Sequence, residues 1–348
     1  MKPVRVLIVD DSAVLRQLLR EIVQSDPRLM VAGESATGED ALARLDEAAP
    51  DAVTLDVEMP GLSGLDVLDR LRRRRPTLPV VMFSHLTERG SRATLEALCR
   101  GASDYTPKPT PSEGLDAARA AIRTQLIPKL LALVKNGSSD APAVPPPRLV
   151  KPRHRPELLA IGASTGGPNA LSQLLKGLGK RFPIPIVIVQ HMPPMFTQWL
   201  AERLTRESSF QVREGEAGGA LEPGVAWLAP GNRHLVVNLS GARPRVDVTE
   251  DRPENSCRPS VDVLFRSVAA LGPRALGLVL TGMGQDGLKG ALALHDAGAA
   301  VLAQDQATSV IWGMPGAVAR AGLAEEVLPL DQMAARVRVR LGMEEETL

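Results

Sequence analysis

The chain has 348 residues, with 41 basic and 40 acidic side chains and a formal net charge of +1. That length suits two average domains, and the balanced charge excludes the basic field by which a protein gathers nucleic acid or an anionic membrane surface. No apolar run approaches the ~20 residues of a membrane-spanning helix, and the run near the N-terminus is too short for a signal peptide. Two cysteines, one in each half, provide no disulfide framework. These features predict a cytoplasmic protein that neither enters a membrane nor binds nucleic acid.

The first part of the chain, residues 1–125, alternates short apolar runs with amphipathic helical patterns. The expected strands are 4–10, 29–34, 52–56, 80–84 and, more weakly, 103–106. The expected helices are 13–24, 40–48, 65–74, 91–99 and 115–134. Such alternation predicts an α/β fold with a parallel sheet covered on both faces.

Polar side chains occur where these strands end. Asp10 and Asp11 close the first strand, Asp56 the third and Ser84 the fourth, and Lys108 follows the fifth. Ligands of a doubly wound sheet bind beyond the carboxyl ends of its strands, so these groups should meet. Three carboxylates at one point require a hard cation such as Mg²⁺, and a carboxylate can attack phosphorus. Acidic residues at strand ends are often only solvated turn residues, but four of five strands ending in this chemistry favours a phosphoacceptor site.

Through the motifs VDDS, LDVEMPGLSGLD and KP, this part resembles the receiver domain of response regulators over about residues 1–125. The resemblance implies a flavodoxin-like doubly wound fold and phosphorylation by a histidine kinase of the chemotaxis type. It assigns roles to Asp56 as phosphorylation site, to Asp10, Asp11 and Asp56 as Mg²⁺ ligands, and to Ser84, Tyr105 and Lys108 as switch residues.

The composition changes between about Lys135 and Pro156, in the stretch KNGSSDAPAVPPPRLVKPRHRP. No hydrophobic period runs through this stretch, and its prolines favour extended backbone. Residues 126–154 are therefore interpreted as the end of a helix followed by a proline-rich linker, which is either a passive tether or a docking segment.

Strand–helix alternation resumes in residues 155–345. Strands are expected at 158–163, 184–190 and 275–280, and helices from about 169, at 197–204 and at 288–297. Three short segments between the second and third of these strands, 225–228, 234–238 and 245–248, are interpreted as hairpins. This part is therefore predicted to be a second α/β parallel-sheet domain with a β-hairpin excursion.

A serine, a histidine and an aspartate follow three strands of this second domain. Ser164 lies in GASTG, which matches the G-x-S-x-G turn that exposes a serine hydroxyl between a strand and a helix. A serine nucleophile needs a base that is itself oriented by an acid. His191 follows the next strand, and Asp286 lies beyond the strand at 275–280, so all three should reach one edge of the sheet. Their order along the chain differs from that of the α/β-hydrolases, which argues against that fold but not against the chemistry.

Each of these groups also has a plainer interpretation. The GASTGG turn could bind phosphate at a helix N-terminus, although it has neither the G-x-G-x-x-G spacing nor the Walker lysine. Asp286 could cap the following helix, and His191 could be a loop histidine without a catalytic role. The remaining histidines are interpreted as structural, with His234 retained as a candidate for a substrate pocket: His85, His154, His234 and His295.

Several motifs in order resemble the catalytic domain of protein-glutamate methylesterases, the CheB family, over about residues 155–345. They are IGASTGGP, QHMPPMFTQWLAERL, LAPGNRHL, RPSVDVLF, LTGMGQDG and SVIWGMPGAV. The resemblance assigns Ser164 as nucleophile, His191 as base and Asp286 as its orienting acid, with Thr165, the backbone N–H of Met283, and Arg258 at the oxyanion hole or substrate surface.

The chain is thus expected to be a phosphorylation-regulated serine hydrolase that removes methyl esters from chemoreceptor glutamates and deamidates selected receptor glutamines. Its expected partners are methyl-accepting chemoreceptors and the kinase, its expected state is a monomer, and its hydrolase needs no cofactor. We also expect activity to fall as pH drops through an imidazole pKa, ~6.5 when unperturbed.

Three other functions compete with this interpretation. The complete Ser164, His191 and Asp286 set argues against a non-catalytic, phospho-dependent receptor or kinase scaffold. The interspersed acids of the C-terminal half argue against a DNA-binding regulator, which would carry a basic recognition helix. Phosphate transfer by the GASTGG turn is the third, and nucleotide titration would test it.

Overall fold

The computed structural model describes residues 2–85, 87–109, 114–135, 154–241 and 243–343. These residues form two compact units, one before and one after residues 136–153. The stretch in which the sequence predicts the proline-rich linker lies almost wholly outside the described residues. Within the described residues, no helix combines the length and apolar character needed to cross a membrane.

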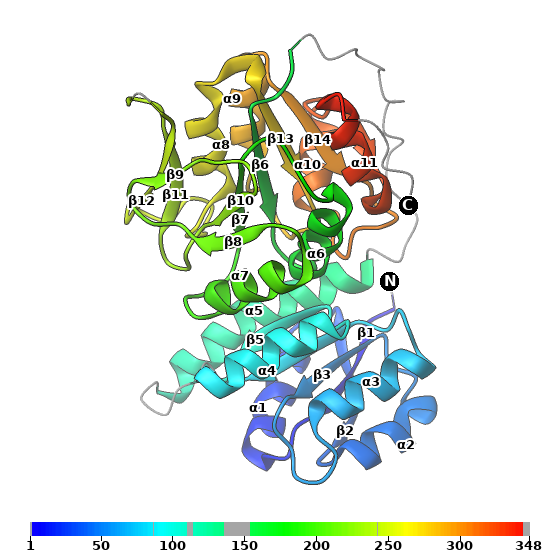
Figure 1. Ribbon diagram of the computed structural model, residues 1–348. Helices are drawn as coiled ribbons and strands as arrows, with labels where there is room; N and C mark the ends of the chain where they lie inside the picture. Colours follow the sequence, from blue (N-terminus) through cyan, green and yellow to red (C-terminus); the bar gives the residue numbers. More distant parts are fainter. Residues whose placement is uncertain (1, 86, 110–113, 136–153, 242, 344–348) are drawn as a thin grey trace. The chain divides into compact units, whose positions relative to one another are not determined.

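The first unit is a five-stranded parallel sheet with strand order β2-β1-β3-β4-β5 (Figure 1). This is the flavodoxin-like doubly wound order, so the predicted fold class is confirmed. Its strands are β1 (Val4–Val9), β2 (Leu29–Ser35), β3 (Ala52–Asp56), β4 (Val80–Ser84) and β5 (Asp104–Pro107). Its helices are α1 (Ala13–Gln24), α2 (Gly38–Ala48), α3 (Gly64–Arg74), α4 (Glu88–Cys99) and α5 (Leu115–Lys135). Helix α1 packs beside α5, while α2, α3 and α4 pack in sequence.

Hydroxyl side chains begin four of these helices. Ser12, Thr37, Ser63 and Thr87 precede α1 to α4, and each accepts a hydrogen bond from a backbone N–H of the first turn. Such caps satisfy donors that the helix cannot satisfy itself. They explain why α2, α3 and α4 begin one to three residues earlier than the apolar pattern predicts, in polar and glycine-containing first turns.

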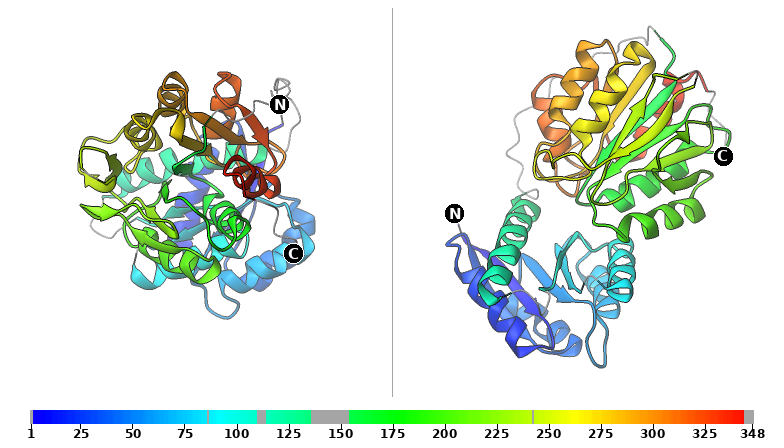
Figure 2. Two further views of the ribbon diagram at one scale, coloured as in Figure 1. Left: turned by 45° about the horizontal axis from the view of Figure 1, so that its top comes forward. Right: turned by 90° about the vertical axis from the view of Figure 1, so that its left-hand side faces the viewer.

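The second unit contains a seven-stranded parallel sheet with strand order β15-β14-β13-β6-β7-β10-β8. Helices cover both of its faces (Figure 2). Its strands are β6 (Leu158–Ala163), β7 (Ile186–Gln190), β8 (Gln211–Glu214), β10 (Val225–Leu228), β13 (Ala275–Val279), β14 (Ala300–Gln304) and β15 (Glu326–Leu328). Its α-helices are α6 (Gly167–Leu178), α7 (Phe196–Glu207), α8 (Val261–Ala269), α9 (Leu288–Asp296), α10 (Met314–Arg320) and α11 (Leu330–Arg340), with a 3₁₀ turn η1 (Gly272–Arg274). A small antiparallel sheet joins β9 (Gly219–Ala220), β11 (His234–Asn238) and β12 (Arg245–Thr249).

One hairpin prediction is confirmed and one is wrong. Strands β11 and β12 pair antiparallel, as expected for a hairpin. Strand β10 instead lies in the main sheet, parallel to both β7 and β8. A short apolar run of this kind suits a buried parallel strand and an antiparallel one equally, so its pattern could not decide between them.

Three adjacent strands of the main sheet, β13, β6 and β7, carry the predicted triad to one edge. Ser164 directly follows β6, His191 directly follows β7, and Asp286 lies in the loop between β13 and α9. Because all three strands are parallel, their carboxyl ends meet at the same place. Strand β7 lies on one side of β6 and β13 lies on the other, so the strand order reverses at β6. A ligand crevice is expected at the carboxyl ends of the strands where the order reverses in this way.

Candidate active site

Ser164 lies in a tight turn between β6 and α6. Its backbone N donates to Thr281 O at 3.0 Å, and its carbonyl oxygen accepts from Gly167 N at 2.8 Å and from Gln190 Nε2 at 2.9 Å. Gly166 has a φ of 79°, a value that side chains other than glycine rarely adopt. Helix α6 then begins without a side-chain cap. The turn therefore holds the serine by its backbone.

Close approach at the neighbouring loop requires glycine. A Cβ built on Gly282 would lie 2.8 Å from Ser164 Cβ and 2.4 Å from Met314 Sδ. Only a residue without a side chain lets the loop after β13 pass this near to the serine. Gly282 N and O are also fixed by backbone bonds to Ile311, Gly313 and Met314. The loop that leads to Asp286 is thus anchored directly against the turn that carries Ser164.

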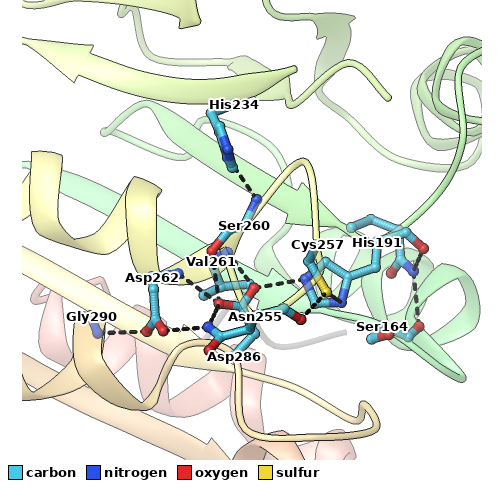
Figure 3. Close-up of polar contacts among 11 residues, drawn as sticks. Ser164, His191, His234, Asn255, Cys257, Ser260, Val261, Asp262, Asp286 and Gly290 are labelled. Atoms are coloured by element: carbon cyan, nitrogen blue, oxygen red, sulfur yellow. Dashed lines mark hydrogen bonds and ion pairs between the residues drawn. The ribbon is translucent and has the colours of Figure 1, made fainter. Parts of the chain in front are cut away.

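Asp286 is buried and is surrounded by hydrogen-bond donors (Figure 3). Oδ2 accepts from Val261 N at 2.7 Å and lies 2.8 Å from His191 Nε2. Oδ1 accepts from Ser260 Oγ at 2.8 Å, Asn255 Nδ2 at 2.9 Å and Asp262 N at 3.2 Å. Burial alone would raise the pKa of Asp286. The hydrogen bond and the charge of His191, together with the hydrogen bonds from Val261 and Ser260, outweigh burial and lower the pKa below its ordinary value. The carboxylate is therefore ionised and fixed.

His191 contacts a partner through each of its ring nitrogens. Nε2 faces Asp286, and Nδ1 lies 3.8 Å from Cys257 Sγ. Burial lowers the pKa of His191, but hydrogen bonding and charge from Asp286 and Cys257 outweigh it and raise the pKa to about 9. The ordinary value of ~6.5 belongs to an imidazole without such neighbours, and the two contacts move the pKa of His191 upward from it. With Nε2–H on Asp286, Nδ1 is the nitrogen that can accept a proton.

Ser164 lies beside His191 (Figure 3). Within the described residues no hydrogen bond joins Ser164 Oγ to the ring, and the Nδ1 position is shared with the Cys257 thiol. Catalytic hydrogen bonds are often long or absent until a substrate arrives, so this geometry is compatible with a Ser–His–Asp arrangement.

The three further residues predicted near the substrate differ in their surroundings. Met283 is half-buried in the loop between β13 and α9, next to Gly282. Thr165 is buried, and its carbonyl oxygen accepts from Thr281 Oγ1 at 2.9 Å. The guanidinium of Arg258 is occupied by Asn232 Oδ1 and by the carbonyl oxygens of residues 250 and 251. Roles for these three residues stay predictions, and the contacts of Arg258 tie it to neighbouring loops.

Four residues of the network were missed by sequence reasoning: Asn255, Cys257, Ser260 and Asp262. They fall within or directly before RPSVDVLF, a motif from which only Arg258 was selected. Their nearness to that motif was the one available signal. His234 is fully buried, with Nδ1 accepting from Ser260 N at 3.2 Å and Nε2 3.2 Å from Arg252 O. These contacts give it a structural role behind the loop.

The first unit gathers its predicted residues at the carboxyl edge of its sheet. Lys108 Nζ lies 2.7 Å from Asp56 Oδ2 and 3.0 Å from Asp10 Oδ2. Asp10, Asp11 and Asp56 offer carboxylate oxygens within 4.8 Å of one another, a donor set that suits Mg²⁺. Burial, with the charge of Asp10, raises the pKa of Asp56 to about 6 against the opposing effect of Lys108. A bound cation would favour its ionised, nucleophilic form.

Two of the three predicted switch residues, Ser84 and Tyr105, lie in the strands β4 and β5 near this edge. Ser84 Oγ donates to His85 O and Gly90 O, both at 3.3 Å, at the start of α4. Lys129 from α5 lies 5.1 Å from the centroid of the Tyr105 ring and donates to its carbonyl oxygen. Ser84 thus contacts the start of α4, and Tyr105 contacts α5 through Lys129.

Comparisons with known proteins cover both units. Residues 159–337 match the family model described as CheB methylesterase, and residues 6–119 match that of the response regulator receiver domain. A protein-glutamate methylesterase/protein-glutamine glutaminase of Trichodesmium erythraeum is 46% identical over 352 residues, covering 98% of this chain and all of the relative. One from Pseudomonas aeruginosa is 46% identical over 337 residues, covering 96% of this chain and 95% of the relative.

A solved structure is similar to the second unit alone. The crystal structure of the Thermotoga maritima CheB methylesterase catalytic domain is 38% identical, with a TM-score of 0.51. It covers 52% of this chain and 97% of that chain.

Proposed function

The chain belongs to the CheB methylesterase family, and from this premise we propose that it hydrolyses methyl esters of chemoreceptor glutamates and deamidates selected receptor glutamines. It is an enzyme whose receiver domain makes the hydrolase responsive to phosphorylation in chemotaxis-type signalling. The observation that carries the assignment of the active site is the Asp286–His191 pair, which lies with Ser164 on three adjacent strands.

Acylation begins at Ser164. Its Oγ attacks the carbonyl carbon of the substrate's ester while His191 Nδ1 takes the hydroxyl proton. Asp286 holds the ring by Nε2 and stabilises the imidazolium that forms. When the tetrahedral intermediate collapses, the proton passes from Nδ1 to the departing methoxy group, and methanol leaves. For a glutamine substrate the same steps release ammonia.

Deacylation repeats these steps with water. His191 Nδ1 takes a proton from water, the hydroxide attacks the acyl carbon, and the proton returns to Ser164 Oγ as the glutamate leaves. Both halves require a donor set for the negative oxygen of each tetrahedral intermediate. We assign the backbone N–H of Met283 and that of Thr165 to this role, since Thr165 directly follows Ser164 and Met283 directly follows Gly282, which packs against Ser164. Arg258 remains assigned to the substrate surface.

Receiver domains are phosphorylated in a Mg²⁺-dependent reaction, and the acidic cluster of this chain fits that cation. We assign Asp56 as the phosphoacceptor and Asp10, Asp11 and Asp56 as the residues that would hold Mg²⁺. Lys108 would contact the phosphoryl oxygens. Ser84 and Tyr105 would report the modification to α4 and α5. The phosphodonor is a histidine kinase of the chemotaxis type, and the site of action is the cytoplasmic part of the receptor.

Methanol release from a methylated receptor fragment tests the proposal. Ser164→Ala should lower turnover by about 10³-fold or more, since a triad serine acts as part of a unit. Ser240→Ala, which removes an exposed hydroxyl from the loop between β11 and β12, is the matched control and should match the wild type. Near-normal turnover in Ser164→Ala would disprove the nucleophile. Receptor binding by the wild type without methanol or ammonia release would favour the scaffold instead.

A further inference from the structure

A tight turn beside the catalytic pair contributes two side chains that the mechanism above does not use. Glu254 N donates to Cys257 O at 3.1 Å, and Cys257 N donates to Glu254 O at 2.8 Å. Between them, Asn255 and Ser256 have φ values of 51° and 60°. Two successive positive φ values define a type I′ turn, in which glycine is favoured at the second position. The Arg266 guanidinium of α8 holds Glu254 by two hydrogen bonds.

Asn255 joins two buried carboxylates through one amide nitrogen. Its Nδ2 donates to Asp286 Oδ1 at 2.9 Å and to Asp262 Oδ2 at 2.7 Å. Both amide hydrogens are thereby used. Asp262 is fixed on its other oxygen, which accepts from Gly290 N of α9 at 2.7 Å, and burial raises its pKa. Asn255 is therefore oriented by one carboxylate while it holds the other, which is the carboxylate that orients His191.

Cys257 contacts the opposite end of the same pair. Its sulfur lies 3.8 Å from His191 Nδ1 and 3.4 Å from Asn255 O. Because Asp286 holds Nε2, the thiol meets the ring nitrogen that must accept the proton of Ser164. A thiol at this place competes with the serine hydroxyl for that nitrogen. When the ring is protonated, its Nδ1–H can donate to the sulfur, so the contact with Cys257 also raises the pKa of His191.

The charged groups around the imidazole ring come from the turn, from the loop before α9 and from the helices α8 and α9. Asp286 and Cys257 contact the ring directly. Behind Asp286 lie Asp262, the Glu254–Arg266 ion pair and Lys289. Of these groups only Asp286 and Cys257 reach the ring, so they are the groups that a change in its titration should report.

We propose that the turn at residues 254–257 positions the catalytic pair from both ends, with Asn255 fixing Asp286 and Cys257 holding the base nitrogen of His191 until a substrate arrives. This role of the turn depends on the triad proposed above and adds two positioning residues to that triad. Asn255 does not contact the ring, whereas Cys257 contacts the ring nitrogen that takes the proton. Asn255 acts through Asp286, and Cys257 acts through the ring.

Asn255→Gly tests the carboxylate end without disturbing the backbone, because glycine suits the positive φ of that position. The variant removes two hydrogen bonds, one of them to Asp286, and should lower kcat about 10- to 100-fold, with KM changed less than about twofold. The far-downfield NMR signal of the His191 Nε2 proton should weaken or shift. Ser256→Gly is the matched control, since it makes the same backbone change at the exposed neighbour, and it should behave as the wild type in both measurements.

Cys257→Ala tests the ring end. Without the sulfur, His191 loses a partner that favours its charged form, so its titration should move to lower pH in the full chain. The acid limb of kcat/KM should move with it, and Cys257→Ser, which restores a hydrogen-bonding group, should lie between alanine and wild type. The ring titration is read by NMR in the Ser164→Ala background as well, where no turnover is needed.

These measurements separate the turn from the triad. Normal turnover in Ser164→Ala would disprove the proposed nucleophile, while the His191 titration would still test the turn. If Ser164→Ala is inactive, but Asn255→Gly equals Ser256→Gly in kcat and Cys257→Ala leaves the titration of His191 unmoved, the role of the turn is overturned and the triad stands.

Discussion

Each unit places a buried aspartate at the carboxyl edge of a parallel sheet, Asp56 in the first unit and Asp286 in the second, and the pKa values of the two carboxyls shift in opposite directions. Asp56 meets one cation, Lys108, and a second carboxylate, Asp10, and its pKa rises to about 6. Asp286 meets five donors, and its pKa falls below the ordinary value. Both are almost inaccessible to solvent. Burial therefore does not decide the charge of a carboxylate, whereas the number of donors around it does.

The difference matches the proposed roles of the two residues. Asp286 must stay ionised and still through every step, and a full set of donors ensures both. Asp56 must attack a phosphoryl group, so its oxygens cannot all be occupied by fixed donors of the protein. The chain leaves part of its stabilisation to a bound cation, which makes the charge of Asp56 conditional.

The largest expected effect comes from removing the charge of Asp286. Asp286→Asn should lower kcat about 10⁴-fold, because an amide cannot hold His191 in the required tautomer or stabilise its imidazolium. Methanol release should fall equally with and without a phosphodonor. Asp251→Asn changes an exposed carboxylate in the same unit and serves as the control. A loss of less than tenfold in Asp286→Asn would contradict the view of Asp286 as the orienting acid.

Removing the charge of Asp56 should instead abolish regulation. A small-molecule phosphodonor with Mg²⁺ should activate the wild type by about 5- to 150-fold, the usual range for coupling between sites. Asp56→Asn should show no such response, and chelation of Mg²⁺ should remove it from the wild type. Activation that persists in Asp56→Asn would place the phosphorylation site elsewhere.

The pH profile of the hydrolase follows from His191. The base works only when neutral, so a pKa of about 9 means that its active form grows as pH rises towards that value. From pH 7 to pH 9 the neutral fraction grows about 50-fold, and kcat/KM should rise to a similar extent. Stopped assays of methanol release over this range measure it. A plateau reached already at pH 7 would show that His191 titrates near its ordinary value in the working enzyme.

The positions of the main site residues could be predicted because each one directly follows a strand. Ser164, His191, Asp56 and Lys108 lie at or just beyond strand ends, and parallel strands bring such ends together. Sequence motifs then supplied the chemistry. The same rule could not give the pKa of His191, because that pKa depends on Asp286 and also on Cys257, which lies 66 residues away along the chain.

Contacts made by the small antiparallel sheet and by the turn after it could not be predicted from the sequence for the same reason. Asn255 meets Asp286 across 31 residues, and no periodic pattern announces a two-residue turn built from asparagine and serine instead of glycine. The prediction for strand β10 was wrong because β10 lies between β7 and β8 in the sheet, although both of these strands precede it in the sequence. Local patterns predict elements, whereas pairing is decided by packing.

The smallest expected effect concerns stability, and it tests whether Asp56 is held in an unfavourable charge state. In the folded chain Asp56 keeps its proton up to about pH 6, while an unfolded aspartate loses it near ~4. Between these values the folded state binds more protons, so the stability of the receiver falls as pH rises, and above pH 6 the full cost is present. This cost in the free energy of unfolding is on the order of 2–3 kcal/mol. It is an upper limit for the gain in stability of Asp56→Asn, because Asn cannot replace the ion pair with Lys108.

Asp56→Asn should therefore raise the melting temperature of the receiver by several degrees at pH 8 and by little at pH 5, where the wild-type carboxyl is already protonated. Calorimetry of the full chain without Mg²⁺, run at pH 8 and at pH 5, measures the two melting temperatures. Asp46→Asn, at an exposed carboxylate of the same unit, should change little at either pH. Added Mg²⁺ should stabilise the wild-type receiver but not Asp56→Asn, because the cation would satisfy the carboxylate that the protein leaves unsatisfied. If Asp56→Asn were destabilising at pH 8, Lys108 alone would outweigh burial, and the contrast with Asp286 would disappear.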